Sequence, residues 1–203
     1  MDYINEEAGY GIAGHLLVII AFASALCAGI AFFFGAKYED LSWKRIARSI
    51  FGVHLISIWG IFFLLLFLLI NHKFQYQYVW QHSSRSMEMQ YILACLWEGQ
   101  EGSTLLWLLW HTVIGSVLIY HKGKWEAPVL SIIMLVQVFL TSMLLGIYIG
   151  DVHIGSNPFL LIRELPQNIV LPWTKSANYL SNPKIIEYIQ NSRGLNPLLQ
   201  NYW

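Results

Sequence analysis

The sequence predicts an all-α membrane protein with four transmembrane helices, and two observations support this fold class. Of the 203 residues, 56% are hydrophobic and only 12% are charged, with a mean hydropathy of +0.50. A soluble domain carries about a quarter of its residues as charged side chains. In addition, four apolar stretches have about the 20 residues that a helix needs to cross a bilayer core about 30 Å thick.

The four predicted spans together form an N-terminal module over residues 1–150. They cover residues 14–35, 50–70, 103–120 and 128–150. Apart from a histidine at its edge, the first span contains no ionisable residue, and the fourth opens with Pro128, whose missing N–H costs nothing there. In the first span Ala21, Ala25 and Gly29 recur every four residues. This spacing indicates either a seam for a closely packed helix or an alanine-rich helix without a specific partner.

The orientation follows from the basic residues between the spans. Six of the 12 Lys and Arg residues lie in two short segments, 36–49 and 121–127: Lys37, Lys44, Arg45, Arg48, Lys122 and Lys124. Because segments rich in Lys and Arg stay in the cytoplasm, we expect both termini, the 71–102 loop and the 151–203 tail to lie outside. The formal net charge is zero, so the composition offers no basic face for nucleic acid.

The 71–102 loop is long and aromatic, which argues against disorder. We expect it to form an ordered aromatic surface on the outer leaflet. Its aromatic residues include Phe74, Tyr76, Tyr78, Trp80, Tyr91 and Trp97. At its end, Ser103 is predicted to cap the third helix, with Glu101 favoured by the helix dipole. In the polar tail, residues 182–194 are predicted to form a short helix that ends at a glycine.

Two histidines, His54 and His111, fall inside predicted spans, where ionisable residues are costly. At about 1.5 Å per residue their heights differ by roughly 12 Å, whereas two axial ligands of one haem iron lie about 4 Å apart. We therefore expect neutral imidazoles hydrogen-bonded to neighbouring helices rather than a shared haem. Cys27 and Cys95 match no disulfide scaffold or zinc spacing, and we interpret both as packing residues.

Residues 96–107 read LWEGQEGSTLLW, which closely resembles the LWxGxEGSxLLW signature of the cytochrome c haem lyase family, comprising CcmF and its CcsA-type relatives. Three further strings resemble elements of this family and occur in the expected order. They are YV with HS at residues 78–84, SNPF at 156–159 and LNPLLQ at 195–200. The resemblance therefore extends over essentially the whole chain.

The resemblance implies a function in attaching haem to apocytochrome c. The family joins haem, received from a haem chaperone on the outer face, to the two thiols of a CxxCH apocytochrome. We expect other cytochrome c maturation subunits as further partners and the bacterial inner membrane as the location. Nine matching residues are candidates for handling haem, none with an assigned catalytic role: Tyr78, His82, Trp97, Glu98, Gly99, Glu101, Gly102, Ser103 and Trp107. We expect them to shape a platform beside haem rather than to ligate iron.

The chain also departs from the family pattern. In the family, LNPLLQ is followed by a helix that opens with an IHPP histidine, and the iron-ligand histidines and the tryptophan-rich WWD segment come later. The sequence stops at Trp203. We therefore expect an N-terminal portion of a haem lyase that is not active by itself and that works with a missing C-terminal half.

Two other functions are compatible with parts of the sequence. One is a non-catalytic membrane scaffold that pairs with a separate haem lyase half. The other is a small multipass transporter, which predicts charged or broken helices near the middle of the bilayer. The sequence offers only Gln137 there, so we rank the transporter last.

Overall fold

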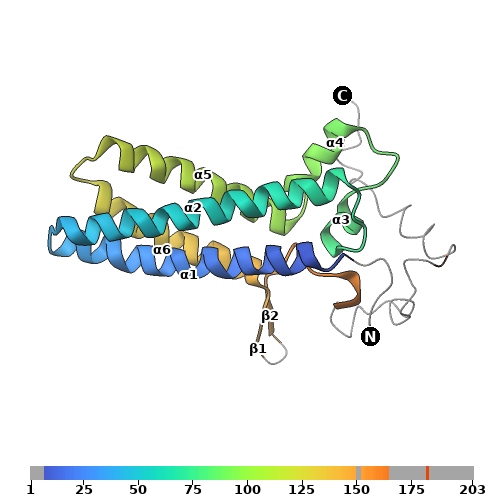
Figure 1. Cartoon of the computed structure of the whole chain (residues 1–203), viewed down its shortest axis with the longest axis horizontal. Helices are drawn as coiled ribbons and strands as arrows, with labels where there is room; N and C mark the ends of the chain where they lie inside the picture. The colour runs from blue at the N-terminus through green and yellow to red at the C-terminus, as the bar shows by residue number, and fades with distance from the viewer. Residues whose placement is uncertain (1–6, 150–151, 165–181, 183–203) are drawn as a thin grey trace. The chain divides into compact units, whose positions relative to one another are not determined.

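The computed structural model describes residues 7–149, 152–164 and 182, with the backbone alone described at 147–149 and 152–154. It is mostly helical (Figure 1). Four helices are long and apolar enough to cross a membrane: α1 (Gly9–Lys37), α2 (Leu41–Ile70), α5 (Gln100–His121) and α6 (Glu126–Leu145). The predicted set of four apolar helices is thus confirmed. The tail helix predicted over residues 182–194 and the LNPLLQ string lie outside the described residues, apart from Asn182.

The remaining elements are short. They are α3 (Gln77–His82), α4 (Met89–Ala94), the 3-10 helices η1 (Cys95–Trp97) and η2 (Ile162–Glu164), and the strands β1 (Ile147–Ile149) and β2 (Val152–Ile154). The two strands pair antiparallel, with Tyr148 opposite His153. This hairpin is a small departure from the predicted all-α fold.

Two compact units make up the chain. We call residues 15–62 and 103–157 the helical unit, and residues 1–14, 63–102 and 158–203 the loop unit. Three of the long helices, α1, α2 and α5, contribute residues to both units. Each unit is described by itself.

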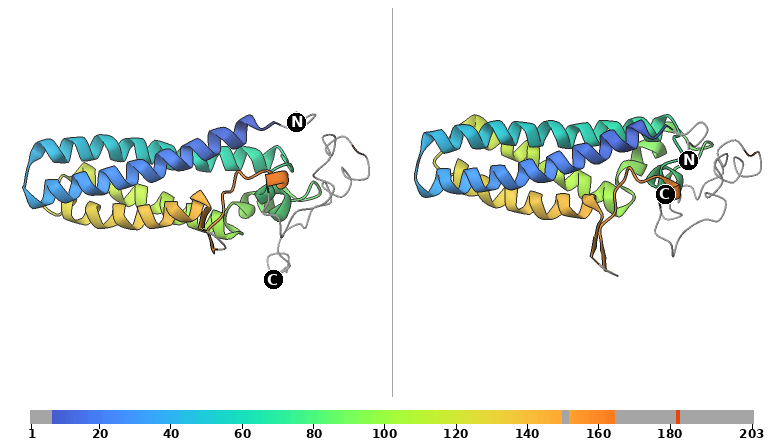
Figure 2. Two further views of the ribbon diagram at one scale, coloured as in Figure 1. Left: turned by 90° about the horizontal axis from the view of Figure 1, so that it is seen from below. Right: turned by 60° about the horizontal axis from the view of Figure 1, so that its bottom comes forward.

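In the helical unit, α1, α2 and α6 run side by side (Figures 1 and 2) and share a core of small and apolar side chains. The core consists of Ala25, Ala28, Ala31, Phe32, Ala47, Phe51, Ala127, Leu130 and Met134. A Cβ atom placed on Gly29 would lie 3.3 Å from the Cβ of Met134, so α6 packs directly on the small-residue seam of α1. Of the two interpretations of that seam, close helix packing is therefore the one observed.

An ion pair between α2 and α6 lies in this unit. Arg48 donates from Nε to Oε1 of Glu126 at 2.6 Å and from Nη2 to Oε2 at 2.7 Å. Because Glu126 is only 3% exposed, this two-bond pairing satisfies a carboxylate that would otherwise be buried alone. The segment 36–49, expected as a loop, is mostly helical. Its helix α2 starts after Asp40, whose side chain accepts a hydrogen bond from the Ser42 N–H at 2.7 Å.

The fourth helix is shorter than the predicted span 128–150, because it ends at Leu145. Gly146 adopts the left-handed conformation (φ 65°) that terminates helices, and the chain continues into β1. After β2, Gly155 is also left-handed (φ 73°), and a side chain there would overlap the Met143 carbonyl group. The Ser156 N–H donates to that carbonyl oxygen at 3.0 Å, so the hairpin closes on the end of α6.

In the loop unit, the aromatic residues of the 71–102 segment form a core. Phe74, Tyr76, Tyr78 and Trp80 are all at most 5% exposed. The expected aromatic surface is therefore wrong for these four residues. Part of this segment pairs with a distant one: the Gln77 N–H donates to the Leu160 carbonyl and the Ile162 N–H to the Gln75 carbonyl, each at 2.9 Å, on either side of the buried Tyr76. This pairing with residues 160–162 cannot be read from the loop sequence alone.

Candidate functional site

Five residues of the loop unit lie together: Tyr78, His82, Cys95, Gly99 and Gly102. We call them the motif cluster. Tyr78 and His82 are four residues apart on α3, so their rings share one face, with centroids 4.3 Å apart. The Tyr78 hydroxyl donates to the Cys95 carbonyl oxygen at 2.7 Å. This buried bond joins α3 to the segment that leads into α5.

The two glycines of the cluster are fitted against α3 and its surroundings. A Cβ atom on Gly99 would lie 2.8 Å from His82 Nε2 and 3.0 Å from a Tyr78 ring carbon. On Gly102 it would overlap the Leu96 carbonyl oxygen and the Tyr78 hydroxyl. At Gly102 the overlap is with a backbone carbonyl, so this position of the WEGQEG string requires glycine for a steric reason, whereas at Gly99 an added side chain would have to displace the His82 and Tyr78 rings.

The helix α5 begins at Gln100, three residues earlier than predicted. Gly102 therefore lies within its first turn, and Ser103 lies inside the helix rather than at its cap. Glu101 is in the first turn, as expected for an acidic residue near the positive end of the helix dipole.

The His82 ring is held by its own helix. Its Nδ1 lies 2.8 Å from the Tyr78 carbonyl oxygen, and because a carbonyl can only accept, Nδ1 carries the hydrogen. In the neutral ring the lone pair is then on Nε2, the atom next to Gly99. A backbone carbonyl orients many metal-ligating histidines in this way. His82 is thus a half-buried imidazole whose Nε2 can accept a hydrogen bond or ligate a metal.

Burial keeps the other two polar side chains of the cluster neutral. It raises the pKa of the Tyr78 hydroxyl above its ordinary value; a hydrogen bond with the Gly99 backbone opposes this rise, and the charges of Glu101 and Glu98 add to it. Burial also raises the pKa of the Cys95 thiol to about 12, with a further contribution from Glu98. Cys95 is therefore a protonated thiol at neutral pH and packs as predicted, with Sγ 2.8 Å from the His82 carbonyl oxygen.

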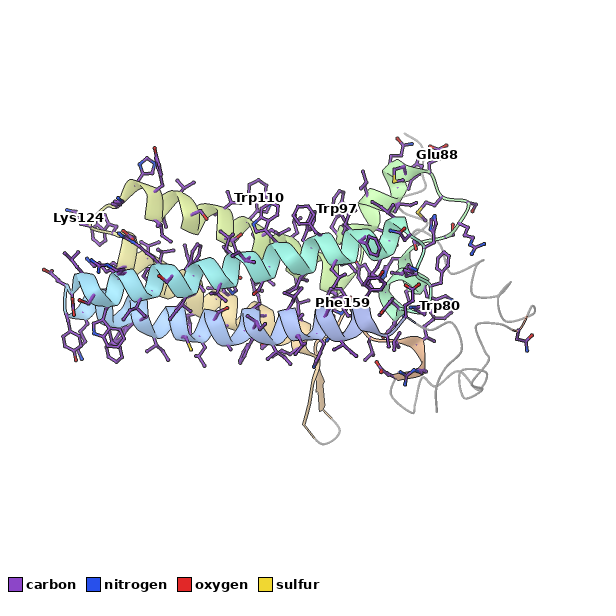
Figure 3. All side chains as sticks on the ribbon, in the orientation of Figure 1. Trp80, Glu88, Trp97, Trp110, Lys124 and Phe159 are labelled. Carbon is purple, nitrogen blue, oxygen red and sulfur yellow. The ribbon has the colours of Figure 1, made fainter. Side chains whose placement is uncertain are left out.

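The remaining predicted site residues are distributed as follows. Trp97 is 48% exposed and points outward from the ribbon (Figure 3), and Glu98 and Glu101 are half-buried. Ser103 and Trp107 belong to the helical unit, where both are exposed. The structure thus gathers Tyr78, His82, Gly99 and Gly102 into one cluster, with Trp97 as an exposed aromatic residue of the same unit.

The intramembrane histidines differ from each other. His54 is fully buried and Nδ1 donates to the Ala21 carbonyl oxygen at 2.9 Å, the bond to a neighbouring helix that was expected. His111 has no such bond from Nδ1, and its ring lies 6.4 Å from the Trp107 ring. Among the described residues, no three His, Cys, Asp or Glu side chains come together to hold a metal ion.

The SNPF string at residues 156–159 had no predicted role in the site. Its residues pack on the α1 residues of both units. In the helical unit the Asn157 side chain lies 2.6 Å from His15 Nδ1. In the loop unit the Phe159 ring covers Gly14 so closely that a side chain at that position would overlap the ring. The Tyr76 hydroxyl adds to this packing, because it accepts from the Gly11 N–H at 2.8 Å and donates to the Glu7 carbonyl at 2.6 Å. Sequence spacing gave no signal for these partners.

Comparison with known proteins supports the resemblance seen in the motifs. The chain is 26% identical over 154 residues to the cytochrome c-type biogenesis protein CycK of Bradyrhizobium diazoefficiens. This alignment covers 76% of the chain and 23% of the relative. It is 28% identical over 165 residues to the cytochrome c-type biogenesis protein CcmF of Pseudomonas aeruginosa, covering 76% of the chain and 22% of that protein. No protein-family model matches the chain.

A solved structure has the same fold. The cytochrome c haem lyase CcmF aligns with a TM-score of 0.61 at 24% identity, over 77% of this chain and 26% of that one. The predicted resemblance to the cytochrome c haem lyase family is thereby confirmed, and the chain is a multi-pass membrane protein whose homologues are cytochrome c biogenesis proteins. It spans 22 to 23% of the length of the curated relatives that it matches.

Proposed function

We propose that this chain is the N-terminal part of a haem lyase-type protein of cytochrome c biogenesis, and that its motif cluster forms a platform beside the place where haem meets apocytochrome c. The steric fit of Gly99 and Gly102 against Tyr78 and His82 carries this proposal. This fit explains why the resemblance includes both the two glycines and the Tyr78–His82 pair, because the glycines of one string pack against the side chains of the other.

The platform would bind and orient the reactants rather than take part in the chemical reaction. Tyr78 and Cys95 are neutral and buried, so neither supplies a nucleophile at neutral pH. The vinyl groups come from haem and the thiols from the apocytochrome, and a protein in this role supplies binding and orientation. The cluster would provide a rigid surface, with Trp97 as an exposed ring against which a flat ligand can stack.

Among the described residues of the motif cluster, His82 and Gly99 could provide one contact with haem. His82 keeps a lone pair on Nε2 in a half-buried position, and Gly99 leaves open the space that a Cβ atom would fill. The His82 side chain could contact the edge of haem, which fits a platform beside haem rather than an iron ligand. Apart from the Trp97 ring, the other contacts of a haem site would come from outside the described residues.

The orientation of the platform rests on the basic segments. Lys122 and Lys124 connect α5 to α6, and Lys44 and Arg45 lie in the first turns of α2. Because Lys and Arg favour the cytoplasmic side, we propose that the loop unit lies on the outer, periplasmic face of the bacterial inner membrane. The proposed partners there are a haem chaperone, apocytochrome c and other maturation subunits or a C-terminal half.

The test is holocytochrome c yield in cells whose own copy of the gene carries Gly99→Ala. We expect the yield to fall at least about tenfold, because the added methyl group meets His82 and Tyr78. The control is Gly9→Ala in the same unit, where a Cβ atom would meet nothing within 4 Å. Wild-type yield from Gly99→Ala, at wild-type protein level, would contradict the platform. If the wild-type chain supports a normal holocytochrome c yield but purifies without haem, the scaffold function is favoured instead.

A further inference from the structure

Two polar side chains lie in the interior of the helical unit, at about the same height along the helices. His54 on α2 and Gln137 on α6 are both 0% exposed. His54 bonds through Nδ1 to the Ala21 carbonyl on α1, and Gln137 bonds through Nε2 to the Leu108 carbonyl on α5 at 3.0 Å. These two side chains therefore link all four long helices at one level, and the Gln137 side chain is also the group that faces the His54 ring.

The His54 and Gln137 side chains and their carbonyl partners contain more hydrogen-bond acceptors than donor hydrogens. The Ala21 and Leu108 carbonyls can only accept, so His54 Nδ1 and the Gln137 amide nitrogen donate to them. His54 Nε2 and Gln137 Oε1 remain, both buried and within hydrogen-bonding reach of each other, but both are acceptors in the neutral side chains, so neither supplies the other with a hydrogen. Turning the amide of Gln137 by 180° gives no relief, because its oxygen would then face the oxygen of Leu108.

Nearby hydroxyl groups do not supply the missing donor. Ser24 on α1 donates to the Ile20 carbonyl at 2.6 Å, Thr112 on α5 to the Leu109 carbonyl at 2.7 Å and Thr141 on α6 to the Gln137 carbonyl at 2.6 Å. Each hydroxyl is therefore used by its own helix. Since a buried acceptor without a donor costs about 1–3 kcal/mol, two adjacent ones call for an additional donor.

We propose that the His54–Gln137 pair is a binding site for one small hydrogen-bond donor, a single water molecule that donates one hydrogen to His54 Nε2 and the other to Gln137 Oε1. A water molecule has the two hydrogens that this pair lacks, and buried water is held in this way by otherwise unsatisfied polar groups. A protonated ring could also donate to Gln137. However, the groups that act on the ring are the Ala21 carbonyl and the Gln137 side chain, neither of which is anionic.

The water would complete a polar junction between the four helices. Without it, the level contains two facing acceptors that favour separation of α2 from α6. With it, the chain of bonds runs from Ala21 through His54, water and Gln137 to Leu108. The site does not depend on haem, so it stands or falls independently of the proposed function.

The test is nitrogen-15 NMR of the full chain, labelled at histidine and purified in detergent. The His54 signals are assigned by their loss in His54→Phe. We expect a neutral ring with hydrogen on Nδ1, an unprotonated Nε2 in a hydrogen bond, and magnetisation transfer from water to the Nδ1 hydrogen. In Gln137→Leu, which removes one of the two acceptors, the transfer should fall at least about twofold, whereas the exposed control Gln90→Leu should leave it unchanged.

Three results would overturn the site. They are a doubly protonated His54 ring, hydrogen on Nε2 instead of Nδ1, or a neutral ring without transfer from water. The wild-type spectrum decides between these results and the expected one by itself, so a failure of Gln137→Leu to fold would not protect the proposal.

Discussion

The helical unit and the loop unit are stabilised in different ways. In the helical unit, Ala25, Ala28 and Gly29 let α6 approach α1, and the contacts are mainly apolar. In the loop unit, tyrosine hydroxyls bond to distant backbone groups, and Phe159 fills the space at Gly14. The helical unit therefore rests mainly on apolar packing, with the Arg48–Glu126 pair as a polar contact within it, whereas the loop unit is joined largely through single polar atoms that bond to distant backbone groups.

The largest expected effect is that of Gly102→Ala in the loop unit. The added Cβ atom would overlap both the Leu96 carbonyl oxygen and the Tyr78 hydroxyl. Overpacking of this kind typically costs about 1–3 kcal/mol, and an overlap with the backbone places it at the upper end. We expect a lower thermal midpoint in detergent and loss of holocytochrome c. Gly52→Ala, where a Cβ atom meets nothing within 4 Å, is the control in the helical unit.

In the helical unit the corresponding test is Arg48→Met. It leaves Glu126, 3% exposed, without its two hydrogen bonds. Because Arg48 itself is about one-third exposed and solvent screens the pair, we expect a loss of about 1–3 kcal/mol rather than the full cost of a broken buried pair. Unfolding in detergent measures this loss. The double variant Arg48→Met with Glu126→Gln should recover part of it, and no recovery would show that the pair is not the cause.

A smaller effect is expected for Tyr78→Phe. The ring stays, so packing on His82 is kept, but the Cys95 carbonyl loses the closer of two donors and keeps the Glu98 N–H at 3.4 Å. Because the carbonyl is not left without a donor, we expect the loss of one intramolecular hydrogen bond, about 0.5–1.5 kcal/mol. The thermal midpoint should fall less than for Gly102→Ala. An equal or larger fall would mean that the hydroxyl, and not the glycine fit, dominates this unit.

The last effect is absent at neutral pH and develops only at alkaline pH. The folded-state pKa of Cys95 is raised to about 12 from an ordinary value of 9.0, mainly by burial. A raised pKa means that this contribution to stability is complete below about pH 9 and is lost as the pH rises towards 12. We expect Cys95→Ala to reduce the loss of stability between pH 9 and 12, as measured by denaturation at each pH. An unchanged slope would show that the thiol is accessible to water.

Sequence reasoning predicted the two units unequally, for physical reasons. Apolar length and basic segments are local properties, so the four long helices and the seam at Ala21, Ala25 and Gly29 could be predicted. Their ends could not, because Asp40 as a cap and Gly146 as a stop depend on backbone geometry. The ion pair of Arg48 with Glu126 was also missed, since it joins residues 78 positions apart.

For the candidate site, the motif strings predicted the correct residues but not their contacts. Tyr78, His82, Gly99 and Gly102 were chosen by resemblance, and their convergence depends on how α3 folds back on the 95–102 segment. The burial of Tyr76 was mispredicted because its backbone pairs with Leu161 and its hydroxyl bonds to Glu7 and Gly11, all far away in the sequence. Long-range pairing of this kind leaves no periodic signal.

The central claim is that the motif cluster is on the outer face of the membrane. It is tested most directly by placing a single cysteine at Trp97, which is 48% exposed, in a chain with Cys27→Ser and Cys95→Ser. A membrane-impermeant thiol reagent is added to intact spheroplasts before and after permeabilisation. We predict full labelling before permeabilisation. Labelling only afterwards would put Trp97 in the cytoplasm and contradict the account.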